Sequence, residues 1–211
     1  MKVVILGATG RTGTELVCQA LDRGLHVVAY CRDCLKLDVV HPQLMKVSGQ
    51  LDNRDDLRSA INNCDAVLSA LGPMGKPSDH ELSDGIANVL SAMEECGVSR
   101  LIALSTTSAQ DPLDQDNRRL KMRRDMVRKG RPTSYEQIVR YTQMIRESHT
   151  DWTLVRIAAI LTEKPLTHQA KVGYMGKDRF RSSLSRANLA WFMLEQLTST
   201  EHIRKAPALS N

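Results

Sequence analysis

Glycine residues near the start of the chain are spaced to bind phosphate. The segment Gly7-Ala8-Thr9-Gly10-Arg11-Thr12-Gly13 directly follows the apolar residues 3–6. A strand that turns through glycines into a helix presents backbone N–H groups and the positive end of the helix to a pyrophosphate. Such turns can need glycine for packing alone. A strand before the turn, a helix after it and a second strand at residues 26–31 nevertheless favour dinucleotide binding.

The residue that follows the second predicted strand indicates which dinucleotide binds. An acidic residue there accepts hydrogen bonds from the ribose of NAD, whereas an arginine suits the 2′-phosphate of NADP. The residue is Arg32, and Arg11 of the glycine segment can lie on the same side, so two guanidinium groups favour NADP(H). The neighbouring Asp33 leaves ribose binding, and therefore NAD(H), as the alternative.

Apolar runs and helical stripes alternate along the chain and predict the elements that position these residues. Runs at 3–6, 26–31, 44–47, 65–70, 100–104 and 152–157 are typical of buried parallel strands. Helical patterns lie between them, and two capping boxes, which begin at Ser78 and at Thr133, predict helix starts. The fold class is therefore α/β, with one doubly wound, mostly parallel sheet in a single domain over residues 1–211.

The ends of the predicted strands bring further candidate residues to one edge of the sheet. Leu71 and Gly72 follow the strand at 65–70, where a glycine lets the adenine–ribose half of a dinucleotide approach the backbone. Loops around 72–80, 105–132 and 157–180 should form the substrate side, with Met74, Ala159 and Ile160 in the pocket. The residues expected to bind NADP(H) are Gly7, Thr9, Gly10, Arg11, Thr12, Gly13, Arg32, Leu71 and Gly72.

Composition and charge describe an ordinary chain with one unusual segment. Hydrophobic residues make up 42% and charged residues 25% of the 211 residues, and apolar runs stay well short of the ~18–20 residues of a membrane span. Residues 118–131 carry eight basic side chains and one acid, a local charge of +7 in a chain of net charge +5, so the remainder sums to −2. We interpret this segment first as a solvated helix and second as a basic lid over an anionic ligand. Nucleic-acid binding is the weakest interpretation, because no aromatic residue is interleaved.

The five cysteines form no regular framework, which favours a reducing, cytoplasmic location. We expect no membrane partner, because the apolar runs are short, and no metal site. Cys31 and Cys34 have the C-x-x-C spacing of half a zinc site or of a redox pair. A second Cys/His pair with ligand spacing is missing from the sequence, and Cys31 ends a predicted strand. We therefore interpret the spacing as coincidental.

Taken as a whole, the sequence resembles the atypical short-chain dehydrogenase/reductase family, especially proteins similar to NmrA and to flavin reductase (biliverdin-IXβ reductase). The resemblance covers nearly the whole chain and implies a Rossmann fold, an NADP(H) cofactor and reductase activity. In the flavin reductases a serine after the fifth strand positions nicotinamide and substrate. Thr106 takes that place here, with Ser105 beside it, so these two are the expected catalytic residues. The resemblance is carried by Gly7–Gly13, Arg32-Asp33 and residues 105–108, 144–148, 165–167, 192–194 and 197–198.

The acid of ordinary short-chain dehydrogenases is absent. Their Tyr-x-x-x-Lys motif lets a tyrosine protonate an alkoxide, but the residues four positions after the four tyrosines are Cys34, Val139, Ile145 and Asp178. A flavin, quinone or linear tetrapyrrole spreads the added charge over a conjugated system, so hydride transfer can rely on proximity and orientation. We therefore expect an NADPH-dependent reductase of a small flat acceptor, flavin or quinone first. The alternative is a non-catalytic NADP(H)-binding redox sensor with a protein partner.

Overall fold

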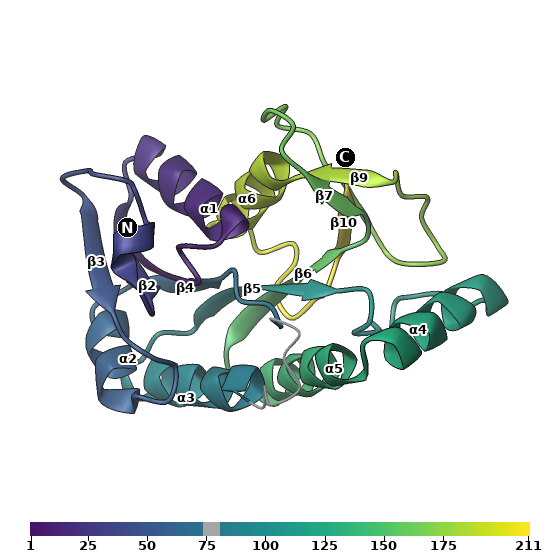
Figure 1. Cartoon of the computed structure of the whole chain (residues 1–211), viewed down its shortest axis with the longest axis horizontal. Helices are drawn as coiled ribbons and strands as arrows, with labels where there is room; N and C mark the ends of the chain where they lie inside the picture. Colours follow the sequence, from purple (N-terminus) through teal and green to yellow (C-terminus); the bar gives the residue numbers. More distant parts are fainter. Residues whose placement is uncertain (74–80) are drawn as a thin grey trace.

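A parallel sheet forms the middle layer of the computed structural model, which describes residues 1–73 and 81–211 (Figure 1). The strand order is β3-β2-β1-β4-β5-β6-β10-β8, and β8 runs antiparallel to β10 while the other neighbours are parallel. The prediction of a doubly wound, mostly parallel sheet is confirmed. The strands are β1 (Lys2–Leu6), β2 (His26–Cys31), β3 (Leu44–Ser48), β4 (Ala66–Ser69), β5 (Arg100–Thr106), β6 (Asp151–Ile157), β8 (Lys171–Gly173) and β10 (Ala208–Ser210).

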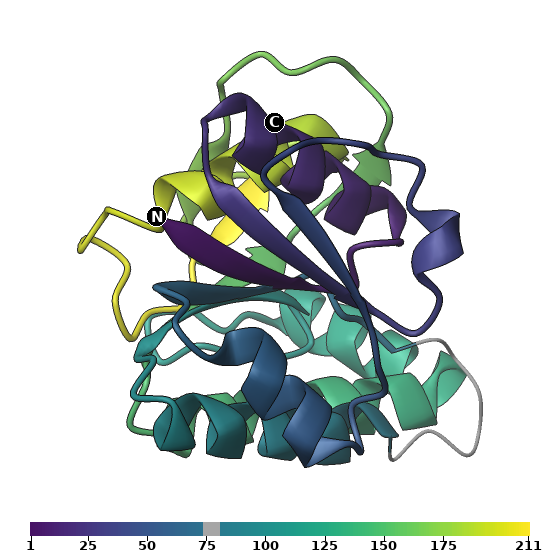
Figure 2. The same ribbon diagram turned by 90° about the vertical axis from the view of Figure 1, so that its left-hand side faces the viewer.

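Helices cover both faces of the sheet, which explains why its strands are apolar without alternation (Figure 2). α1 (Arg11–Asp22) and α6 (Arg186–Glu195) lie on one face, and α2 (Arg54–Ile61), α3 (Glu81–Glu95) and α5 (Pro132–Glu147) lie on the other. Successive side chains of β1 point to opposite faces, so Val3 packs in the α1/α6 core and Val4 in the α2/α3/α5 core.

Shorter elements complete the carboxyl half of the chain. β7 (Ile160–Thr162) and β9 (Ser183–Ser185) form a separate two-stranded sheet, and the 3-10 helix η1 (Cys34–Lys36) follows β2. The basic segment forms α4 (Arg118–Gly130), in which every residue keeps some exposure to solvent. The sequence patterns miss β7 to β10, because strands of three residues leave too little periodicity to detect. In the part of the chain that the structure describes, no helix is long and apolar enough to cross a membrane.

The predicted capping box at Thr133 is wrong. α5 begins one residue earlier, at Pro132, so Thr133 lies inside the first helical turn and no side chain caps the helix. Proline suits the first helical position, because its fixed φ is already helical and the N–H that it lacks would have no partner there. The other predicted capping residue, Ser78, lies outside the described residues.

A buried arginine joins four segments that are distant in sequence. Arg156 of β6 is fully buried, and its guanidinium holds the Asp114 carboxylate in two hydrogen bonds of 2.6 and 2.8 Å. The same guanidinium donates to the carbonyls of Ala206 at 2.6 Å and Ala109 at 3.1 Å. Asp114 in turn accepts from the backbone N–H of Met175 at 2.9 Å. The loop after β5 and the segment after β8 are therefore fixed to β6.

The Asp114–Arg156 pair gives a first prediction. Burial opposes ionisation of Asp114, but the hydrogen bonds from Arg156 and from backbone N–H groups outweigh it and lower the carboxyl pKa. Replacing Asp114 by Asn leaves a buried guanidinium without its counter-charge, so we expect a loss of about 3–5 kcal/mol in the free energy of unfolding at pH 7. Urea denaturation monitored by circular dichroism measures this loss.

The pH dependence follows from the direction of the shift. A carboxyl whose folded pKa is lowered contributes its stability above the unfolded pKa of about 3.9 and loses it as the pH falls through the folded pKa. The difference between wild type and Asp114→Asn should therefore shrink below about pH 4. Asp55→Asn is the control, because this side chain is 85% exposed and its pair with Arg58 is worth about 0–1 kcal/mol. Equal losses in the two variants would contradict the assigned role of Arg156.

Candidate functional site

The carboxyl ends of five neighbouring strands place most of the predicted site residues along one edge of the sheet. The glycine segment follows β1, Arg32 follows β2, and Leu71 and Gly72 follow β4. Thr106 ends β5, and Ala159 comes two residues after β6. Doubly wound folds bind their ligands at this edge, where the crossover connections leave a crevice.

The glycine segment makes a tight connection between β1 and α1. Gly7 has a φ of +74°, and its carbonyl accepts the N–H of Gly10 at 3.0 Å. A Cβ on Gly13 would lie 2.1 Å from the Gly7 carbonyl oxygen, so only glycine allows this approach of helix and strand. Gly10 is the N-cap of α1 and makes no side-chain capping bond. The first N–H groups of α1 can therefore serve an anion such as a pyrophosphate.

The remaining predicted cofactor contacts differ in their surroundings. Thr9 is half-buried. The Thr12 residue is 9% exposed, and its backbone N–H belongs to the first turn of α1. Leu71 is half-buried and Gly72 is exposed, and a Cβ on Gly72 would meet no atom of the described residues within 4 Å. Packing against the described part of the protein therefore does not require glycine at position 72, and close ligand approach stays its predicted role.

The two arginines predicted to read the 2′-phosphate lie in different settings. Arg32 is exposed at the end of β2. Arg11 pairs with Glu163, which follows β7, at 3.3 Å between Nη1 and Oε1. Their side chains are 76% and 60% exposed, and such a surface pair is worth about 0–1 kcal/mol, so a phosphate dianion can compete for Arg11. The shared contact of both arginines with one phosphate stays a prediction.

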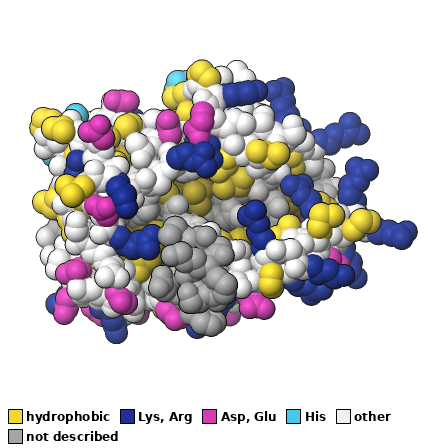
Figure 3. Space-filling model, in the orientation of Figure 1, with side chains coloured by type: hydrophobic (Ala, Val, Ile, Leu, Met, Phe, Trp, Pro, Cys, Tyr) yellow, Lys and Arg dark blue, Asp and Glu magenta, His cyan; other side chains and the backbone are white. Residues whose placement is uncertain are grey.

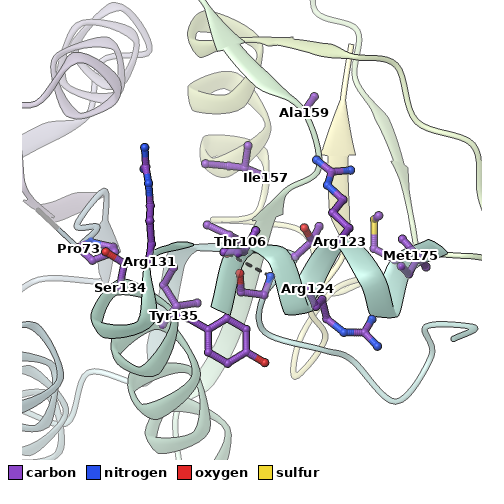
Figure 4. Close-up of a pocket in the computed structure, with 15 residues that line it drawn as sticks. Pro73, Thr106, Arg123, Arg124, Arg131, Ser134, Tyr135, Ile157, Ala159 and Met175 are labelled. Atoms are coloured by element: carbon purple, nitrogen blue, oxygen red, sulfur yellow. Dashed lines mark hydrogen bonds between the residues drawn. The ribbon is translucent and has the colours of Figure 1, made fainter. Parts of the chain in front are cut away.

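A cavity of about 410 Å³ lies between the ends of β5 and β6 and the corner where α4 meets α5 (Figure 4). Its lining combines apolar side chains with hydroxyl groups and arginines, as in pockets that hold a mainly apolar ligand through a few polar contacts. The lining residues are Pro73, Thr106, Thr107, Ser108, Leu120, Arg123, Arg124, Val127, Arg131, Ser134, Tyr135, Ile138, Ile157, Ala159 and Met175.

The two predicted catalytic residues point to different places. Thr106 lines the cavity, and its hydroxyl oxygen accepts the N–H of Ser108 at 3.2 Å, so its proton is free to be donated to a ligand. Ser105 is 2% exposed, shares a hydrogen bond of 3.1 Å with Thr142 of α5, and does not line the cavity. The reason is the alternation of side chains along β5, which turns neighbouring residues to opposite faces.

The predicted substrate-pocket residues are separated in the same way. Ala159 lines the cavity, whereas Ile160 begins β7 with a residue exposure of 74% and is not part of the lining. Ile157, at the end of β6, takes the wall position beside Thr106 (Figure 4). Met74 lies outside the described residues.

Arginines from the basic segment form one side of the cavity. Figure 4 shows Arg123 and Arg131 extending on two sides of Ile157, while Arg124 points away from them. Arg124 pairs with Asp116. Figure 3 shows other Lys and Arg side chains spread over the α4 end of the molecule. Leu120 fixes α4 by packing against Ala158 and Met175, so the lid interpretation fits the cavity side of α4 and the solvated-helix interpretation fits the other side.

Three cavity residues lie outside the loops predicted to form the substrate side, namely Ser134, Tyr135 and Ile138 of α5. Arg131, which belongs to the predicted loop 105–132, stands between α4 and α5. The Gly130-Arg131-Pro132 corner could have signalled a helix break, because proline cannot continue the preceding helix. Another tyrosine of α5, Tyr141, is buried and donates to the Leu104 carbonyl at 2.9 Å. Burial raises the pKa of Tyr141 to about 12, so this phenol stays protonated within the core.

The described residues contain no group of three or more Cys, His, Asp or Glu side chains that could hold a metal ion. The fold, the glycine connection and the adjoining cavity together define a Rossmann nucleotide-binding protein. The NAD(P)H-binding family model matches residues 7–200, and the chain belongs to that family.

Other proteins are similar to this chain in sequence or in structure. An uncharacterized protein of Mycobacterium tuberculosis is 29% identical over 106 residues, which are 50% of this chain and only 12% of that protein. A short-chain dehydrogenase/reductase of Veillonella parvula in complex with NADP has a TM-score of 0.78 and 18% identity, covering 100% of this chain and 94% of that chain. ChuY, an anaerobilin reductase of Escherichia coli O157:H7, has a TM-score of 0.80 and 15% identity, covering 100% of this chain and 97% of that chain.

Arg32 provides a test of cofactor choice. Arg32→Ala should weaken NADPH binding by roughly 1.5–3 kcal/mol, the range for hydrogen bonds to charged groups, and leave NADH binding nearly unchanged. Isothermal titration with both cofactors measures this difference. Lys36→Ala is the matched control, because Lys36 is an exposed cation of η1 that pairs with Asp33. Equal dissociation constants of NADPH and NADH for the unmutated protein would rule out the preference.

Proposed function

We propose that the protein is an NADPH-dependent reductase that transfers hydride to a flat conjugated acceptor, with a flavin or a quinone as the first candidates. The observation that carries this proposal is the cavity beside Thr106, which adjoins the edge where the glycine segment would hold the cofactor. Its apolar walls come from Ile157, Ala159 and Met175. A planar ring stacked there would lie next to the nicotinamide end of a bound dinucleotide.

The side chains around the cavity favour an acceptor that needs no protein acid. Tyr135 lines the cavity, but Val139 stands where the lysine of a Tyr-x-x-x-Lys pair would be. The Thr106 hydroxyl can orient a ligand by a hydrogen bond, but we do not assign it the role of an acid that protonates the acceptor. Hydride transfer to a conjugated ring can proceed from alignment alone, since the ring delocalises the added charge and solvent delivers the proton.

The arginines around the cavity favour an acceptor that carries an anionic group. Arg123 approaches the cavity from α4 and Arg131 from the corner between α4 and α5, whereas Arg124 points away from them and pairs with Asp116. Guanidinium groups bind phosphates and carboxylates through paired hydrogen bonds. FMN fits this description, and the similarity to a structure described as an anaerobilin reductase supports reductase activity.

Filling the cavity separates catalysis from cofactor binding. Ala159→Trp should place an indole against Ile157 and abolish NADPH oxidation with FMN or a quinone, while NADPH still binds. The unmutated protein should turn over at about 1 s⁻¹ or faster, the low end of ordinary enzyme rates. Ile160→Trp is the matched control and should keep this rate, because residue 160 is exposed outside the cavity. Absorbance at 340 nm follows the reaction.

A sensor would behave differently in the same assay. It would bind NADPH and turn over no acceptor, and a partner protein would bind with different affinity in the presence of NADPH and of NADP⁺. That pair of results would replace the reductase proposal by the regulatory one. Loss of activity in both Trp variants would instead contradict the placement of the acceptor beside Ala159.

The charge of Arg123 tests the kind of acceptor. Arg123→Gln should raise the KM for FMN by about threefold to tenfold and leave the KM for an uncharged quinone nearly unchanged. The increase should diminish in high salt, since Arg123 is exposed. Lys121→Gln is the control, because Lys121 lies on the same helix but lines a separate groove. An equal change in the KM for both acceptors would show that Arg123 does not bind the phosphate of FMN.

A further inference from the structure

Cys31 and Cys34 lie in direct contact at the turn that carries Arg32. Cys31 ends β2, Cys34 begins η1, and their sulfur atoms are 2.7 Å apart. Both are free thiols. A disulfide bond is about 2.05 Å long, so the two sulfurs need to approach by less than about 1 Å to form one. The interpretation of this spacing as coincidental therefore does not account for the geometry.

Local hydrogen bonds produce this contact. Asp33 caps η1 by accepting the N–H of Leu35 at 3.2 Å, and Leu37 donates to the Cys34 carbonyl at 3.2 Å. The Cys31 carbonyl accepts the N–H of Gly49 at 3.1 Å, which fixes Cys31 to the end of β3. The turn is thus held from both sides with its two thiols together. Cys31 is 5% exposed, whereas Cys34 is half-buried and open to a reagent.

We propose that Cys31 and Cys34 form a redox-active dithiol that a low-molecular-weight disulfide converts reversibly to a protein disulfide, and that NADP(H) bound at Arg32 slows this conversion. The site is separate from the acceptor cavity, whose lining includes neither cysteine. The dithiol chemistry is independent of the reductase proposal, while the cofactor effect rests on the proposed contact of Arg32 with the 2′-phosphate.

Because Cys34 is more exposed than Cys31, we expect Cys34 to react first with the small disulfide. The Cys34 thiolate attacks one sulfur of the small disulfide and releases one thiolate, which leaves a mixed disulfide. Cys31 then loses its proton to solvent and attacks the Cys34 sulfur, which releases the second thiolate. Two protein thiols are oxidised to one disulfide, and the reagent is reduced to two thiols. Burial, the hydrogen bond with Cys34 and the nearby Asp33 raise the pKa of Cys31 to about 12, although Lys46 opposes the shift, so Cys31 suits the second step.

The position of Arg32 between the two cysteines predicts the cofactor effect. A 2′-phosphate bound by Arg32 brings up to two negative charges to a residue that is one position from Cys31 and two positions from Cys34. Nearby negative charge disfavours a thiolate, and the thiolate is the attacking species. NADP⁺ should therefore slow the oxidation of the pair, whereas NAD⁺, which lacks this phosphate, should slow it less.

Trypsin makes the disulfide directly visible, because it cleaves after Arg32, between the two cysteines. Intact protein is treated with glutathione disulfide, free thiols are alkylated, and the digest is analysed by mass spectrometry without reductant. We expect residues 24–32 and 33–36 as a linked pair of peptides, two hydrogens lighter than their sum, which separates on reduction. Cys34→Ser should abolish the link, and Cys96→Ser, which changes a half-exposed thiol elsewhere, should retain it.

To test the cofactor effect, the oxidation with glutathione disulfide is repeated in the presence of saturating NADP⁺ or NAD⁺. The binding of each cofactor is measured by titration in the same buffer. Linked peptides should form at least threefold more slowly with NADP⁺ than with NAD⁺, and Arg32→Ala should remove the difference. Alkylated Cys31 beside a persistent glutathione adduct on Cys34 would overturn the dithiol. Linked peptides forming at equal rates with both bound cofactors would overturn the coupling. Weak NADP⁺ binding with normal linkage would identify the cofactor proposal as the failure.

Discussion

The buried ion pair between Arg156 and Asp114 is the interaction on which the connections around the cavity depend. Arg156 occupies the middle of the protein with no solvent exposure, and a guanidinium in such a place needs a counter-charge and hydrogen-bond acceptors. Asp114 and two backbone carbonyls provide them. Because these partners come from the loop after β5 and from the chain before β10, satisfying one charge also fixes the connections around the cavity.

The cofactor side depends on close packing rather than on charge. Glycine at positions 7 and 13 lets α1 begin directly against the end of β1, and this places the first turn of the helix at the edge of the sheet. The two sides meet where β4 and β5 are neighbours, with Gly72 after one strand and Thr106 at the end of the other. A dinucleotide held by the glycine segment can therefore extend toward the cavity, as doubly wound folds generally allow.

The turn after β2 combines two properties in four residues. Arg32 provides a positive charge for a 2′-phosphate, while Cys31 and Cys34 on either side of it bring their sulfurs into contact. The strand fixes one thiol and the 3-10 helix fixes the other, so a small local change in this turn would act on the backbone that carries Arg32. The proposed cofactor contact and the proposed thiol chemistry are thereby adjacent, whereas the cavity is formed by other elements.

The sequence by itself determined the fold class, the positions of the six longer strands and the position of the glycine segment. These features depend on local patterns, namely apolar runs of strand length and glycines at fixed spacing, which need no distant partner. The tertiary structure decided which neighbours face the cavity. Thr106 and Ala159 face the cavity, whereas their neighbours Ser105 and Ile160 do not. Arg131, Ser134 and Tyr135 reach the cavity from the corner between α4 and α5. The capping pattern at Thr133 predicted the wrong start for α5 at this corner. The contact of Cys31 with Cys34 was also decided there, because spacing alone does not determine whether two side chains meet, and the backbone turn between them does.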